Sequence, residues 1–278
     1  MTDLDSLLKK AEHLLERFEK LLPEACETDW SGIAYRWVPK KGLVKVQHPH
    51  AISLDHLKEI EDQISLADGN TRQFVKGRPA NNVLLTGSRG TGKSSLVKAL
   101  LNRYANDGLR LIEVDKKDLV ELPDIVSEIE GRREKYILFC DDLSFDSGEA
   151  GYKELKVVLD GSIAASPENV LVYATSNRRH LMPEYMSENL ETVYSGDEIR
   201  PGETTEEKIS LSERFGLWIS FHPFDQNEYL MIVEHWLDHF KVKRRKGATE
   251  AALQWAMNRG SRSGRIAWQF ARDWAGKS

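Results

Sequence analysis

The segment from Asn82 to Lys98 limits most strongly what this chain can fold into. An apolar run, Val83-Leu84-Leu85, ends at Gly87, and four residues later Gly92-Lys93-Ser94 opens a segment with helical character. The spacing G-x-x-x-x-G-K-[ST] between a strand and a helix is typical of a loop whose backbone N–H groups surround phosphate oxygens. The helix that follows adds its positive N-terminal end. The segment therefore predicts a phosphate-binding loop in an α/β fold.

The chemistry of such a loop assigns roles to its residues. We expect Lys93 to contact the β- and γ-phosphates of ATP, and the Ser94 hydroxyl to bind Mg²⁺. The residues expected to bind the nucleotide are Gly87, Ser88, Arg89, Gly90, Thr91, Gly92, Lys93, Ser94 and Ser95.

Composition narrows the class of protein. The 278 residues are 40% hydrophobic and 30% charged, as in soluble globular proteins, and the formal charge of −5 argues against bulk attraction to nucleic acid or anionic membranes. Asp3 and Asp5 with no apolar core after them argue against a signal peptide, and no apolar run is long enough to span a bilayer. We expect a cytoplasmic protein with Cys26 and Cys140 as reduced thiols.

Before the phosphate-binding loop, three elements are expected. Leu4–Leu22 has the spacing of an amphipathic helix, whose apolar face packs on this chain or on a partner. Alternating apolar residues between Ile33 and Val46 predict a hairpin. Ser53 is placed to cap a helix that runs through about Leu66 and is closed by Asp68-Gly69-Asn70.

From residue 81 the chain alternates apolar strands with helices, the pattern of a parallel sheet. The expected strands are Val83–Thr86, Leu109–Val114, Tyr136–Cys140, Val170–Thr175 and Leu217–Ser220. The expected helices between the first four are Ser94–Tyr104, Leu122–Glu130 and Tyr152–Leu159. The polar stretch between Arg178 and Leu211 reads as a long surface excursion.

After Pro223 the pattern becomes helical. Asp225 and Glu228 form a capping-box pattern for a helix through about Phe240, and two more helices are expected at Glu250–Asn258 and Arg265–Trp274. Their tryptophans are expected to build a core. The predicted domains are an N-terminal extension (1–50), an α/β nucleotide-binding domain (51–222) and a helical lid (223–278).

Further polar residues stand where strands end. Asp141 and Asp142 follow an apolar strand, at the sheet edge where ligands of open α/β folds bind; Asp141 fits a Mg²⁺ ligand and Asp142 a base that polarises the attacking water. Asn177 follows the next strand, where its amide can orient that water. Arg214 precedes the last strand, and Arg265 opens the last lid helix, with Arg262 close by.

Together these residues resemble the AAA+ ATPases from about Ala51 to Trp274. The matching parts are Walker A (Gly87–Ser94), Walker B (Asp141, Asp142), sensor 1 (Asn177), an arginine-finger candidate (Arg214) and a sensor 2 candidate (Arg265). Segments such as Asp-Asp-Leu-Ser-Phe and Glu-Arg-Phe-Gly-Leu are similar to a bacterial AAA+ family catalogued as a domain of unknown function. The resemblance implies a five-stranded parallel sheet in the order 5-1-4-3-2, a C-terminal lid, ATP and Mg²⁺ as ligands, and activity at subunit interfaces.

Two points qualify the expected catalysis. Most AAA+ proteins have Asp-Glu where this chain has Asp141-Asp142, and the shorter Asp142 predicts slow hydrolysis that depends on an oligomer or a partner. Arg214 is expected to act in trans in a homo-oligomer, the alternative being a structural ion pair with a nearby acid.

We therefore expect an ATPase that remodels a protein partner of unknown identity. The alternative is a loader or helper of DNA machinery that binds nucleic acid through the basic cluster Lys241–Lys246, although that cluster also suits a solvated helix end. A small-molecule kinase would not need Asn177, Arg214 and Arg265 in this order. ATP-driven threading of a protein through a central pore usually uses a loop with an aromatic residue after the second strand, and Val114–Val120 has no aromatic residue. Zinc catalysis is also disfavoured, because the His235/His239 pair lacks the Glu of the H-E-x-x-H motif.

Overall fold

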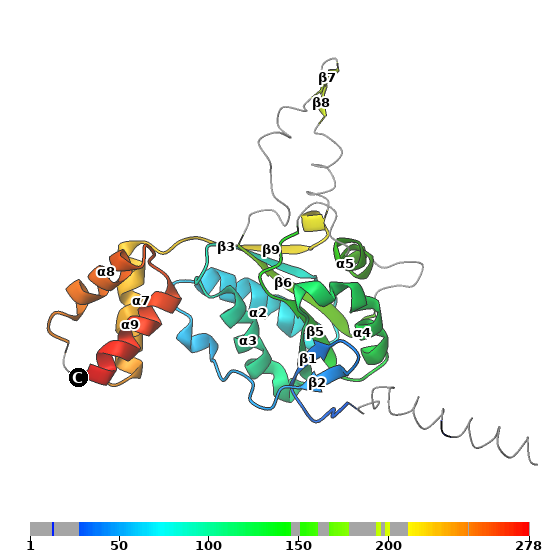
Figure 1. The fold of residues 1–278 in the computed structure, drawn as a ribbon, viewed down its shortest axis with the longest axis horizontal. Helices are drawn as coiled ribbons and strands as arrows, with labels where there is room; N and C mark the ends of the chain where they lie inside the picture. The colour runs from blue at the N-terminus through cyan, green and yellow to red at the C-terminus, as the bar shows by residue number, and fades with distance from the viewer. Residues whose placement is uncertain are drawn as a thin grey trace, which may run out of the picture.

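The protein is built on one large sheet. A computed structural model describes residues 13, 28–145, 151–160, 167–177, 193–195, 198–200, 211–243 and 245–277. Seven strands pair in the order β2-β1-β4-β5-β6-β3-β9 (Figure 1). They are β1 (Ala34–Val38), β2 (Gly42–Lys45), β3 (Val83–Gly87), β4 (Leu109–Glu113), β5 (Lys135–Cys140), β6 (Val170–Ser176) and β9 (Leu217–Phe221). A separate antiparallel pair joins β7 (Val193–Ser195) and β8 (Glu198–Arg200).

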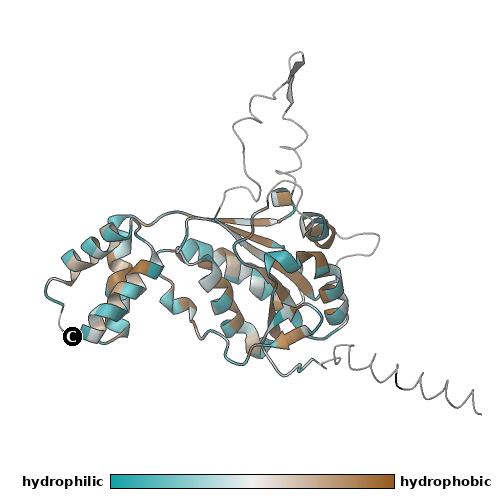
Figure 2. Cartoon of the chain, in the orientation of Figure 1, coloured by the Kyte–Doolittle hydropathy of each residue, from teal (hydrophilic) through white to brown (hydrophobic). Residues whose placement is uncertain are grey.

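Helices cover both faces of the sheet because its strands are apolar on both sides. Val83 and Leu85 of β3 pack in one core with α2 (Glu61–Val75) and α3 (Lys93–Tyr104), whereas Leu84 points into the other core. That second core contains η3 (Lys116–Glu121), α4 (Leu122–Ile129) and α5 (Gly151–Asp160). Figure 2 shows the hydrophobic residues concentrated in these central strands. Two short 3₁₀ turns, η1 (Leu54–His56) and η2 (Ala105–Asp107), complete this part.

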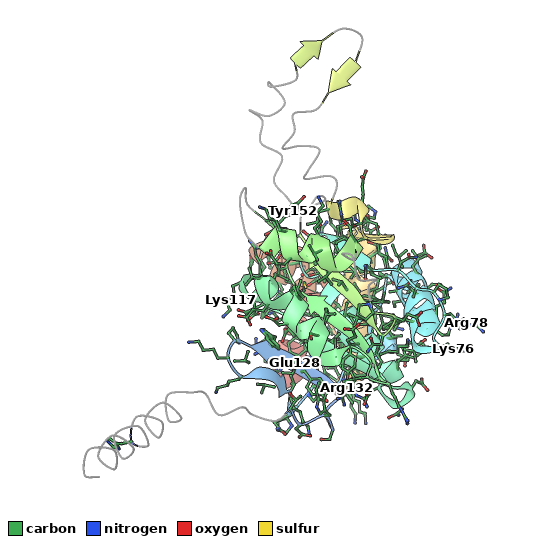
Figure 3. All side chains as sticks on the ribbon, turned by 90° about the vertical axis from the view of Figure 1, so that its right-hand side faces the viewer. Lys76, Arg78, Lys117, Glu128, Arg132 and Tyr152 are labelled. Atoms are coloured by element: carbon green, nitrogen blue, oxygen red, sulfur yellow. The ribbon has the colours of Figure 1, made fainter. Side chains whose placement is uncertain are left out.

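The prediction of a five-stranded sheet is wrong, because the N-terminal hairpin is part of the sheet. Its first strand, β1, pairs in parallel with β4, and β2 then pairs antiparallel with β1. Arg36 lies opposite Glu113 in this register and pairs with it at 2.6 Å. Glu128 of α4 lies against the hairpin turn at Gly42 (Figure 3). The order of the whole sheet therefore differs from the predicted one, although β9-β3-β6-β5-β4 are contiguous within it.

The helix predicted from Ser53 to about Leu66 is also wrong at both ends. Ser53 caps only the turn η1, and α2 continues through Asp68-Gly69-Asn70 to Val75. The Asn70 amide, which would favour a turn, instead donates to the Asn81 carbonyl and to the Tyr173 hydroxyl in the core. These distant partners hold the helix through a sequence that locally signals its end.

The C-terminal helices form a group of their own beside the sheet (Figure 1). They are α7 (Gln226–His239), α8 (Ala248–Asn258) and α9 (Gly264–Lys277), close to the predicted ranges. The capping box at Asp225 and Glu228 is present, with both reciprocal hydrogen bonds. Trp255, Phe270 and Trp274 stack in sequence at ring-centroid distances of 5.9 and 5.5 Å. Among the described helices, none is long and apolar enough to cross a membrane.

Some predictions concern residues outside the described part of the chain. These are the helix at Leu4–Leu22, Cys26, Arg244 of the basic cluster, and most of the stretch between Arg178 and Leu211. The domain boundaries at 50/51 and 222/223 stay predictions. Cys140, by contrast, is a buried free thiol whose pKa burial raises to about 12.

Candidate nucleotide-binding site

The loop between β3 and α3 is folded by its glycines. Gly87, Gly90 and Gly92 all have positive φ angles, of 126°, 76° and 105°. A Cβ atom at Gly87 would lie 1.9 Å from the Phe221 carbonyl oxygen of β9, and one at Gly90 would lie 2.8 Å from Ser263 Oγ of the lid. Because no side chain fits at these points, the backbone can turn tightly and its amides can face an anion above the N-terminus of α3.

Lys93 is buried at the centre of this loop. Its Nζ donates to the carbonyl oxygens of Gly87 and Ser88, both at 2.7 Å, and to Asn177 Oδ1 at 3.1 Å. Burial lowers the pKa of Lys93 to about 8, against the opposing effect of the carboxylates of Asp141 and Asp142. The protein therefore holds the ammonium in position, but the nearby negative charge only partly offsets the cost of burying its positive charge. An anionic ligand would offset the remainder of that cost.

Asp141 and Ser94 form the part of the site that suits a metal ion. Ser94 Oγ and Thr175 Oγ1 both donate to Asp141 Oδ1 at 2.6 Å. A hydroxyl and a carboxylate oxygen are hard donors, and Mg²⁺ is commonly bound by such a pair together with the phosphates of a nucleotide. These residues fit a Mg²⁺ ion that arrives with its nucleotide.

Asp142 is oriented from three sides. Its backbone N–H donates to Thr175 Oγ1 at 2.9 Å, its Oδ1 accepts from Asn177 Nδ2, and its Oδ2 lies 3.9 Å from Arg89 Nη2. The residue has a positive φ of 53°, which aspartate tolerates better than most residues. Asn177 thus connects the Lys93 ammonium to the Asp142 carboxylate, so the two groups are positioned as one unit.

A cavity of about 790 Å³ opens above these groups. Its polar end is lined by residues 89–95 of the loop, both aspartates, Thr175 and Asn177. Gly87 and Ser88, also predicted to bind the nucleotide, do not line it and instead present their carbonyls to Lys93. The remainder is mostly apolar and aromatic, with Ile60 and His56 from one side and Ile232, Trp236 and Trp268 from the lid. A charged end and an apolar end suit a nucleotide's phosphates and base.

The two lid arginines and Arg214 occupy different places. Arg265 lines the cavity at the start of α9, next to the loop at Gly90, whereas Arg262 does not line it. Arg214 lies elsewhere, and its Nε pairs with Asp160 Oδ2 of α5 at 2.5 Å. Within one chain the structure therefore brings together all of the predicted site residues except Arg214.

The sequence did not identify several residues that line the cavity. Thr175 lies inside an apolar strand, and its role follows from the pairing of β6 with β5, which places it beside Asp141. His56 and Ile60 precede the loop by some thirty residues and carry no motif. Trp236 and Trp268, predicted to lie in the lid core, both line the cavity, and Trp236 also packs against the core.

Comparison with solved structures identifies the fold. The chain superimposes on a mutant RuvB of Thermotoga maritima with a TM-score of 0.56 at 15% identity, over 81% of this chain and 65% of that one. RuvB described as a Holliday junction branch migration motor gives 0.52 at 18% identity, over 79% and 63%. The FIGL-1 AAA domain in complex with ADP gives 0.50 at 18% identity, over 81% and 73%. The chain thus spans somewhat less than two thirds of the length of the RuvB chains.

The fold and the phosphate-binding loop between β3 and α3 place the chain in the structural class of P-loop α/β folds that includes the FIGL-1 AAA domain. Within that class, the chain belongs to the family described as "Protein of unknown function (DUF815)", whose model matches residues 31–278. No curated protein matches the sequence.

Proposed function

We propose that the protein binds Mg·ATP and hydrolyses its β–γ bond. The observation that carries this proposal is the hydrogen-bonded chain from Lys93 through Asn177 to Asp142, beside the Ser94–Asp141 pair. Together these groups offer a cation for the phosphates, oxygens for a metal ion and a carboxylate for a water molecule. Phosphoryl transfer requires little beyond this positioning and charge stabilisation.

Each residue has a distinct role in the proposed reaction. Lys93 holds the β- and γ-phosphates, and Ser94 with Asp141 holds Mg²⁺, which when bound neutralises phosphate charge. Asp142 accepts a hydrogen bond from the attacking water, and Asn177 fixes the Asp142 carboxylate in that orientation. Arg265 reaches the phosphates from the lid, so the lid responds to the nucleotide.

Three variants test the ATPase proposal directly. Lys93→Ala should lose ATP binding, whereas Asp142→Asn should bind ATP but hydrolyse it at least about 100-fold more slowly. The matched control is Lys117→Ala, because Lys117 is an exposed lysine on the surface of η3 (Figure 3). This variant should behave as wild type. Purified protein whose ATP turnover is the same in the wild type and in Asp142→Asn would contradict the proposal.

The target of the ATPase is proposed to be a protein. Of the cationic cluster that would serve DNA, Arg245 is paired within the lid, with Asp238 at 2.5 Å and Glu234 at 3.5 Å. This pairing lowers the charge that the cluster offers to phosphates. Capture of partners by Asp142→Asn in the presence of ATP, compared with capture by Lys93→Ala, should identify proteins that are held only by the nucleotide-bound form.

A role in DNA machinery is the second candidate, because the fold is shared with a branch migration motor. Exposed Lys241 and Lys243 are available on the described part of the cluster. ATPase stimulation by DNA that disappears as salt rises would favour this candidate over a protein partner. A turnover rate indifferent to DNA would favour the protein partner.

A further inference from the structure

Arg89 has a position that its place in the phosphate-binding loop does not explain. It lies between Gly87 and Gly90, and its side chain is 78% exposed. It lines the nucleotide cavity and also a second cavity of about 380 Å³, whose other lining residues are Asp142, Ser144 and Asn177. Arg89, Asp142 and Asn177 thus separate the two spaces, at the end of the site where Asp142 would hold its water.

The contact between Arg89 and Asp142 is weak. Nη2 and Oδ2 are 3.9 Å apart, at the limit of an ion pair, and the Asp142 side chain is itself 59% exposed. Exposed pairs of this kind contribute little to stability and exchange readily for a better partner. The other carboxylate oxygen of Asp142 is held by Asn177 and does not depend on Arg89.

The electrostatics around Arg89 favour an additional anion. Lys93 and Arg89 are two cationic side chains that line the same end of the cavity. Of the two acids there, Asp141 already accepts from Ser94 and Thr175. A terminal phosphate carries more charge than one carboxylate and matches the planar guanidinium with two parallel hydrogen bonds.

We propose that Arg89 binds the γ-phosphate of ATP from within the same subunit, exchanging the Asp142 carboxylate for the phosphate. The inference rests on the proposed function, and it deepens it by naming the residue that distinguishes ATP from ADP. The exchange also releases one oxygen of Asp142, which Asn177 continues to hold in place for the attacking water. Arg89 acts within its own subunit and is distinct from Arg214, which pairs with Asp160 away from the cavity.

Nucleotide affinities test this exchange without turnover. Binding of ATPγS and of ADP, each with Mg²⁺, is measured by calorimetry for the wild type, Arg89→Ala and Arg89→Lys. Arg89→Ala should weaken ATPγS binding by about 10- to 100-fold and leave ADP within about twofold. Arg89→Lys should recover part of the loss, because it keeps the charge without the paired hydrogen bonds. An equal loss for both nucleotides, or none for either, would overturn the inference.

A double-mutant cycle isolates the exchange itself. Asp142→Asn removes the competing carboxylate and should tighten ATPγS binding severalfold, and this gain should disappear in the Arg89→Ala background. A gain of the same size in both backgrounds would mean simple repulsion between Asp142 and the phosphate, and would overturn the exchange.

Arg36→Ala controls for the loss of an arginine, since Arg36 is ion-paired on β1, which is separated from β3 by three strands of the sheet. It should bind both nucleotides as the wild type does. A wild-type protein that binds neither nucleotide would overturn the proposed function and this inference together. A wild type that binds both, with Arg89→Ala unchanged, would overturn the inference alone.

Discussion

Lys93 has a protein partner for each of its three N–H groups, yet its pKa is lowered to about 8. Carbonyl and amide oxygens satisfy the hydrogen bonds without supplying a full negative charge, so burial remains the dominant effect. Since the folded pKa lies below that of an exposed lysine, the fold gains stability as the pH rises from about 8 towards 10.5. The charge of Lys93 is thus stabilised best when phosphate oxygens join it.

Nucleotide binding should therefore be linked to proton uptake. At pH 8.5 a lysine with a pKa of about 8 is roughly three quarters neutral, and a phosphate beside it restores the proton. Calorimetric titration with Mg·ADP in two buffers of different protonation enthalpy should show uptake of roughly half a proton or more at pH 8.5. The same uptake in Lys93→Arg, whose guanidinium stays charged, would assign the proton to another group.

Thr175 connects the two aspartates and provides a second test at this scale. It is 2% exposed, donates to Asp141 Oδ1 and accepts from the Asp142 amide. Thr175→Val keeps the shape but leaves Asp141 with one partner fewer and the Asp142 amide unpaired. We expect the Mg²⁺ dependence of nucleotide binding to shift by about tenfold to higher concentration. An unchanged Mg²⁺ dependence would show that Thr175 is only a packing residue.

Among the elements, the turn η1 and the lid helix α7 meet through aromatic rings. His56 of η1 lies 4.9 Å from His239, 5.4 Å from Trp236 and 5.9 Å from His235, measured between ring centroids. The lid therefore closes on the body of the protein through three imidazoles and an indole. Within the described residues, His235 Nε2 is buried without a hydrogen-bond partner, so the neutral ring suits this contact better than the charged one.

This contact predicts a lid that loosens in acid. Burial, followed by His239, lowers the pKa of His56, and burial, followed by Lys58, lowers that of His235; Asp55 and Asp238 oppose these shifts only in part. Because the folded pKa values lie below 6.5, the contact is fully stable above that pH and weakens as the pH falls below it. Mg·ADP affinity should therefore drop severalfold between about pH 7.5 and 5.5.

The matched variants for the lid are His56→Phe and His48→Phe. His56→Phe keeps an aromatic ring but cannot take up a proton, so its affinity should change less with pH than that of the wild type. His48 is exposed, and its replacement should leave the pH dependence unchanged. Parallel pH profiles for the wild type and His56→Phe would exclude the ring contact as the cause.

The sequence could predict those elements that are specified by residues close together in the chain. The loop at Gly87–Ser94, the apolar strands and the capping box at Asp225 are specified by residues close together in sequence, and all are found. The length of α2 was not predictable, because Asn70 is held by Asn81 and Tyr173. Thr175 was missed for the same reason, since its polar partners, Asp141 and Asp142, follow another strand, β5.

At the scale of the whole molecule, the sheet explains where the site lies. The strands β3, β5 and β6 run parallel and end together, so the residues that follow them meet at the carboxyl end of the sheet. The sequence predicts this convergence, but it gave no indication that β1 and β2 extend the sheet beyond β4. That extension lies at the edge opposite β9 and Arg214, so the two edges of the molecule offer different surfaces.

Arg214 provides the last prediction, because its ion pair with Asp160 leaves two explanations for one residue. If Arg214 completes a neighbour's site, Arg214→Ala and Lys93→Ala should each be nearly inactive, and an equal mixture should recover up to about a quarter of the wild-type rate. Activity returns because a Lys93→Ala subunit can supply Arg214 to a neighbouring Arg214→Ala subunit, whose phosphate-binding loop is intact. The specific ATPase rate of the wild type should also rise with protein concentration. If the pair is structural, Arg214→Ala and Asp160→Ala should instead lower the melting temperature alike, and mixing should restore nothing.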